Sequence, residues 1–147
     1  MTKQNIAVFV LRLAMGWLYL YAGLSKVLDP KWSAEGYLKG AKTLPALYQW
    51  FASPSMLPLV NFVNEWGLTL LGASLLLGLF VKISTVGGTL LMALYYLPIL
   101  QFPYVGTHSL IVDEHIVYIA GLAVLMAMDA GKIWGLDRLL ARQKAVR

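Results

Sequence analysis

An apolar stretch over residues 6–28 limits what this chain can fold into more than any other feature, because it is long enough to cross a bilayer as one helix. This stretch contains two cations and, between them, two glycines: Arg12, Gly16, Gly23 and Lys26. Successive members of this set are four, seven and three residues apart. At about 3.6 residues per turn these residues lie near one stripe of the helix, with Tyr19 between the glycines. Glycines let a second helix approach closely, and an arginine in the hydrocarbon region needs a partner. We therefore expect this stripe to face other helices.

Three further apolar stretches predict three more membrane-spanning helices, at residues 59–81, 83–101 and 113–130. Lys82 is expected in a tight turn, and a short loop is expected at residues 102–112. Residues 31–58 are broken by prolines but rich in aromatic side chains, which favours short helices at the membrane interface, over residues 33–44 and 45–52. The sequence thus predicts an all-α fold, an integral membrane four-helix bundle with interfacial short helices between the first and second spans. It would form a single membrane domain over residues 1–147.

Composition agrees with a membrane protein in contact with lipid and argues against a soluble domain, a nucleic-acid-binding protein and an iron–sulfur protein. Apolar residues make up 59% of the chain and charged residues only 13%, outside the usual range of soluble domains. The net charge of +5 does not indicate nucleic-acid binding, because five of the twelve basic residues lie in a tail after the last apolar stretch: Lys132, Arg138, Arg142, Lys144 and Arg147. The chain has no cysteine, so it cannot hold an iron–sulfur cluster or a covalently attached haem.

Polar side chains gather at one end of the predicted bundle, where the first span ends and the second and fourth begin. They are Lys26, Asn61, Asn64, Glu65, His108, Asp113, Glu114 and His115. Ionisable groups inside a span are candidate functional groups. We expect Glu65, Glu114 and His115 to exchange protons with a substrate. Lys26, Trp66 and Tyr118 would bind that substrate.

Other interpretations of these residues stay open. Lys26 with Glu65 or Glu114 would equally make a structural ion pair that locks the bundle. His115 is either a proton-exchanging partner of a quinone or another lipid-soluble substrate, or a hydrogen-bonded histidine at a helix end. No haem is expected, because both histidines of the chain lie at the same entrance. No metal site is predicted, since the histidine and carboxylate spacing matches no known ligand pattern.

Arg12 lies in the inner third of the first span and needs a partner there, because an unpaired arginine at that depth is costly. Two carboxylates are candidates, Asp129 at the inner end of the fourth span and Asp137 in the tail. We therefore interpret Arg12, Asp129 and Asp137 as a structural clamp on the inner side.

These motifs together resemble the DoxX family of small membrane proteins. The resemblance rests on R-x3-G-x6-G-x2-K from Arg12 to Lys26, on Glu65-Trp66-Gly67, on Asp113-Glu114-His115 and on the closing segment GKIWGLD at residues 131–137. The long segment at residues 31–58 is similar to that of the DoxD-like branch, related to the small membrane subunit of thiosulfate:quinone oxidoreductase.

The resemblance implies a redox-linked role at the membrane, beside a larger partner subunit or in a homo-oligomer, with quinone as electron acceptor. The chain would then be the membrane subunit of a quinone-linked oxidoreductase. The alternative is a non-catalytic accessory membrane subunit that docks on a larger respiratory or photosynthetic complex. A small transporter is a third possibility, weakened because no inverted repeat or broken helix is visible in the sequence.

Charge distribution predicts that both termini lie on the cytoplasmic side of the cytoplasmic (inner) membrane. Lys3, Lys82 and the basic tail share one side, whereas the last loop on the opposite side has no lysine or arginine. Reporter fusions at Arg147 and at Gly106 should therefore report opposite sides of the membrane. Reporters on the same side would rule out four spans.

Overall fold

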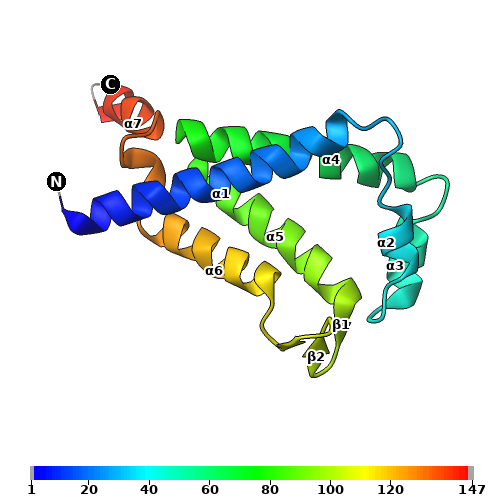
Figure 1. The fold of residues 1–147 in the computed structure, drawn as a ribbon. Helices are drawn as coiled ribbons and strands as arrows, with labels where there is room; N and C mark the ends of the chain where they lie inside the picture. The colour runs from blue at the N-terminus through cyan, green and yellow to red at the C-terminus, as the bar shows by residue number, and fades with distance from the viewer. Residues whose placement is uncertain (1, 146–147) are drawn as a thin grey trace.

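The computed structural model describes the backbone of residues 2–145 and the side chains of residues 2–141 (Figure 1). Within that range there are four longer helices: α1 (Lys3–Val27), α4 (Leu57–Leu77), α5 (Val81–Ile99) and α6 (Glu114–Ala127). Shorter elements connect and follow them: α2 (Glu35–Lys39), α3 (Pro45–Phe51), β1 (Leu100–Gln101), β2 (Tyr104–Val105), β3 (Ser109–Leu110), the 3₁₀-helix η1 (Ala130–Lys132) and α7 (Asp137–Ala145). The side chains of Arg142, Lys144 and Arg147 in the predicted basic tail lie outside the described residues.

The four longer helices form a ring in which each contacts two neighbours. Contacts join α1 to α4, α4 to α5, α5 to α6 and α6 back to α1. They are most extensive within two pairs, α1 with α4 and α5 with α6. The two pairs converge at the end near α7 and diverge toward α2 and α3 (Figure 1).

The α1 stripe predicted from the sequence faces the inside of this ring. Arg12, Gly16, Tyr19 and Gly23 are all buried. Opposite it, Gly72 of α4 is placed so that an added Cβ would lie 2.5 Å from the Cα of Leu20. Glycine is required at such a position because any side chain would force the two backbones apart. The tight α1–α4 packing therefore follows directly from the glycine spacing.

The interfacial segment forms a small second core between the start of α4 and the end of α5. Its buried residues are Ala34, Leu38, Tyr48 and Ala52. The Tyr48 hydroxyl donates to the backbone carbonyl of Leu94 at 2.9 Å. The backbone amide of Lys42 donates to the carbonyl of Pro98 at 2.7 Å. The α2–α3 segment is thus fixed to α5 by hydrogen bonds as well as by apolar contacts.

Two connections differ from the sequence-based prediction. The turn between the second and third helices lies at Gly78 rather than at Lys82, because Gly78 has φ +64° and ends α4 in the left-handed conformation. Lys82 already belongs to α5. The predicted loop at residues 102–112 is part of a small antiparallel sheet of order β1-β2-β3.

Two of the described helices, α1 and α4, are long and apolar enough to cross a membrane. Helix α6 has 14 residues, which at about 1.5 Å per residue is shorter than the roughly 30 Å hydrocarbon core. The structure therefore shows a mostly helical protein with two candidate spans. The complete four-span bundle stays a prediction.

Gly72→Ala tests the close α1–α4 contact. The new Cβ would overlap the backbone of Leu20, so we expect the free energy of unfolding to fall by about 1–3 kcal/mol. Gly67→Ala on the same helix is the matched control, because its Cβ would meet only Val63 at 3.8 Å. That control should be neutral or slightly more stable. Thermal unfolding in detergent would measure both, and equal midpoints would contradict the packing described above.

Candidate functional site

Arg12 is completely buried at the end of the ring where the helix pairs converge. Its Nη1 donates to the carbonyl oxygens of Ala130 and, at 2.8 Å, of Ile133. Its Nη2 donates to the carbonyl of Trp134 at 3.3 Å. Backbone carbonyls left free by the end of a helix are good acceptors for a cation. Arg12 therefore joins α1 to the segment that follows α6.

Among the described side chains, neither predicted partner, Asp129 or Asp137, forms a direct ion pair with Arg12. Asp129 forms ion pairs with Lys82 at 2.8 Å and with Lys132 at 3.0 Å. The Asp137 carboxylate accepts from the backbone amides of Phe80 at 2.8 Å and of Val81 at 3.0 Å. It thus caps the start of α5, where free amides and the helix dipole favour an anion. Arg12 is therefore bound by backbone carbonyl groups, where the prediction expected a carboxylate.

At the opposite end of α6, Asp113 and His115 form a compact pair. Asp113 is the N-cap of the helix, and its Oδ1 accepts from the backbone amide of His115 at 3.0 Å. Its Oδ2 lies 2.6 Å from Nδ1 of His115. The two side chains are only 9% and 14% exposed, respectively. The Asp113–His115 pair leaves Nε2 of His115 without a hydrogen bond to any described residue.

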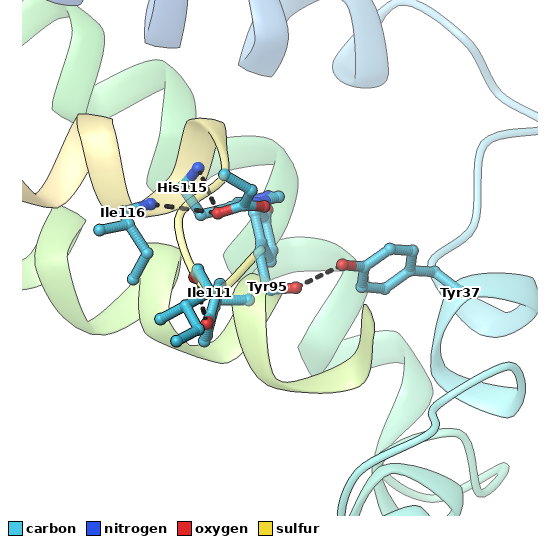
Figure 2. Close-up of polar contacts among 7 residues, drawn as sticks. Tyr37, Tyr95, Ile111, His115 and Ile116 are labelled. Atoms are coloured by element: carbon cyan, nitrogen blue, oxygen red, sulfur yellow. Dashed lines mark hydrogen bonds and ion pairs between the residues drawn. The ribbon is translucent and has the colours of Figure 1, made fainter. Parts of the chain in front are cut away.

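Tyrosine side chains extend this pair toward α2, as Figure 2 shows, and toward α4. The His115 ring meets the edge of Tyr95 on α5, with centroids 6.0 Å apart. The Tyr95 hydroxyl is hydrogen-bonded to the side-chain oxygen of Asn64 on α4. Tyr37 of α2 donates to the backbone carbonyl of Tyr95. One network therefore joins α2, α4, α5 and α6.

Partial burial keeps Tyr37 protonated within this network. The pKa of Tyr37 is raised to about 12, chiefly by this partial burial, and to a smaller extent by the neighbouring Tyr48 and by the carboxylates of Asp113 and Glu114. Tyr37 is therefore a neutral hydrogen-bond donor throughout the physiological pH range.

Two residues of the predicted site, Lys26 and Glu114, lie outside this network. Nζ of Lys26 donates to the carbonyl of Ala22 at 2.9 Å and lies 5.4 Å from the centroid of the Trp32 ring. Glu114 is exposed. Within residues 2–141 neither Lys26 nor Glu114 belongs to an ion pair, so the alternative of a structural Lys26–Glu114 pair is wrong.

Glu65 and Trp66 on α4 are also separate from the network. The Glu65 side chain is half-buried and forms no ion pair within residues 2–141, which excludes a Lys26–Glu65 pair as well. Trp66 is 43% exposed. Of the three residues predicted to exchange protons, the network contains His115 alone.

Sequence reasoning missed the tyrosines at this end of the bundle. Tyr95 lies in the third apolar stretch, and its hydroxyl was a signal, because a phenol within a span needs a hydrogen-bond partner. Tyr118, which was predicted, lies three residues after His115 on the same helix face. Its ring meets the edge of Tyr19 on α1, with centroids 6.3 Å apart. These rings form the aromatic side of the site.

The described side chains place no three His, Cys, Asp or Glu residues close enough together to hold a metal ion. The arrangement is instead suited to moving a proton. A carboxylate bonded to Nδ1 of a histidine fixes the orientation of the ring, so that Nε2 becomes the atom that donates or accepts a proton. The Asp113–His115 pair has that geometry.

The sequence model of the DoxX family matches residues 7–99 of this chain. The chain belongs to the DoxX family. Proteins of this family are membrane-associated and often linked to oxidoreductase-related roles. The matched part of this DoxX protein contains Arg12 and Tyr95, whereas Asp113 and His115 lie after it. No curated protein and no solved structure matches the chain.

Replacing Arg12 tests whether it holds the DoxX bundle together. Arg12→Leu leaves the buried carbonyl of Ala130 and two part-buried carbonyl groups without their donor, so we expect a loss of at least about 3 kcal/mol in the free energy of unfolding. Arg12→Lys should lose less, because lysine keeps the charge but not the planar fork. Arg138→Leu, at an exposed position of α7, is the control and should change stability by less than about 0.5 kcal/mol.

Thermal unfolding of the three variants in the same detergent provides the comparison. If the Arg12→Leu protein were as stable as the wild type but inactive, the structural role of Arg12 would be refuted and a functional role indicated.

Proposed function

We propose that this DoxX protein is the membrane subunit of a quinone-linked oxidoreductase, a four-span bundle in the cytoplasmic membrane with both termini in the cytoplasm. The DoxD-like features of residues 31–58 favour a role similar to that of the small subunit of thiosulfate:quinone oxidoreductase. The observation that carries the proposal is the Asp113–His115 pair with its free Nε2 beside aromatic rings.

Reduction of a quinone to a quinol takes two electrons and two protons. In this proposal the electrons come from a sulfur oxyanion such as thiosulfate, oxidised on a larger partner subunit. His115 donates a proton from Nε2 to a ring oxygen of the quinone, and Asp113 holds the imidazole in the required orientation. The exposed carboxylate of Glu114 adjoins His115 in sequence and returns protons to it from the aqueous side, once for each proton transferred.

The surroundings of His115 fit a lipid-soluble ring. Binding sites for such molecules are mostly apolar and aromatic, with a few polar groups that fix orientation. The ring of Tyr95 on α5 contacts His115. Tyr118 lies three residues further along α6, against the ring of Tyr19. Trp66, near the middle of α4, is exposed and would offer an aromatic surface to a ring in the lipid. These residues support a quinone better than a hydrophilic substrate.

His115→Ala and Asp113→Asn test the proposal. Asn is a good N-cap, so Asp113→Asn should keep α6 intact while it removes the charge that orients His115. We expect quinone-dependent turnover to fall about 100-fold or more in His115→Ala, the usual contribution of a general acid. Asp113→Asn and Glu114→Gln should show smaller losses, and all three variants should remain folded.

His108→Ala is the matched control, because His108 is exposed in the connection between β2 and β3. Each variant is purified with its partner subunit after gentle detergent extraction, and turnover, thermal stability and bound quinone are measured together. Unchanged turnover in folded His115→Ala would refute the proposal. A stoichiometric partner without any quinone on this chain would favour the accessory-subunit alternative.

A further inference from the structure

Tyr19 carries a buried hydroxyl group that no described residue satisfies. Its side chain is 1% exposed, and the hydroxyl has no hydrogen-bond partner within residues 2–141. A buried polar group without a partner costs free energy of folding, whereas phenylalanine would fill nearly the same volume without that cost. Such a departure from the rules of packing is typical of functional positions.

The Tyr19 ring on α1 faces α6, where it contacts the ring of Tyr118. One turn inward along α1, the sulfur of Met15 would be 2.7 Å from a Cβ added at Gly121, so the two helices are in close contact there. At the position of Tyr19, α1 contacts α6 through the aromatic rings of Tyr19 and Tyr118. His115 lies one turn further outward on α6. Tyr19 and His115 thus mark the inner and outer ends of one short path along the seam between α1 and α6.

We propose that the Tyr19 hydroxyl is the inner hydrogen-bond donor of the substrate site and binds a carbonyl oxygen of a lipid-soluble ring of the quinone class between α1 and α6. The proposal rests on the function proposed above and adds a binding residue on α1 to the proton donor on α6.

The surroundings of Tyr19 suit an apolar ring. Tyr19 belongs to a hydrophobic core cluster together with Met15, Leu68 and Leu122. Two further tyrosines pack against this cluster, Tyr118 and Tyr95, and the hydroxyl of Tyr95 is bonded to Asn64. An apolar ring that offers one acceptor satisfies the hydroxyl and keeps the remaining contacts apolar.

The seam is also where a ring can enter with the least loss of packing. Contacts between α1 and α6 are far less extensive than those between α1 and α4. The two helices diverge toward the outer end (Figure 1). A ring that enters there from the lipid passes His115 and Tyr118 before it reaches Tyr19.

Tyr19→Phe removes only the hydroxyl and separates binding from folding. Without quinone, the variant should unfold at the same temperature as the wild type or higher, because the hydroxyl has no partner in the protein. Its affinity for a short-chain benzoquinone should fall about tenfold, the loss expected for one hydrogen bond. Affinity is measured from the quinone-dependent rise in unfolding temperature, and from the quinone retained per protein after gentle extraction.

Tyr48→Phe is the matched control. The Tyr48 hydroxyl has a partner, the carbonyl of Leu94, so this variant should be less stable and bind quinone as the wild type does. Equal quinone affinity in Tyr19→Phe and the wild type would overturn the inference and leave the proposed function in place. A loss of stability in Tyr19→Phe without quinone would also overturn it, since the hydroxyl would then have a partner within the fold. Absence of quinone binding by the wild type would refute the proposed function itself.

Discussion

The guanidinium group of Arg12 is a full charge placed inside an apolar helix bundle, and much of the inner end is arranged to satisfy it. Three backbone carbonyl groups accept its hydrogen bonds, and all belong to the segment between α6 and α7. The same segment continues to Asp137, whose carboxylate caps the start of α5. Gly78 permits this arrangement, because a Cβ there would come within 2.8 Å of Nη1 of Arg12. One buried cation thus connects α1, the α4–α5 turn and the segment after α6.

The end of the bundle near α2 and α3 is held differently. There the helix pairs diverge (Figure 1), and hydrogen bonds from tyrosine side chains act together with apolar contacts to hold the α2–α3 segment to α5. Tyr48 and Tyr37 both donate to carbonyl groups of α5. Neutral phenols tolerate an apolar environment better than charged groups, provided that each hydroxyl has a partner. The substrate site proposed above lies at this end of the bundle, where the helix pairs diverge.

Much of the fold was predictable because helical periodicity is a local property. The inward face of α1 follows from the spacing of Arg12, Gly16 and Gly23, and the helices occur where the apolar stretches predicted them. The partners of the ionisable groups were predicted less well. Lys26 binds the carbonyl of Ala22 on its own helix rather than a carboxylate of another. A long flexible side chain can satisfy itself locally, and sequence spacing does not reveal whether it will.

The sequence by itself therefore determined which residues form helices, which face of α1 is buried, and that this face carries a charge in need of a partner. These properties depend on neighbours within a few turns of one chain segment. Only the tertiary structure decided that carbonyl groups rather than Asp129 or Asp137 satisfy Arg12. It likewise decided that the locally formed Asp113–His115 pair lies beside Tyr95 of another helix. The physical reason is that contacts between helices depend on their crossing angles and relative depth, which are set by the packing of the whole bundle.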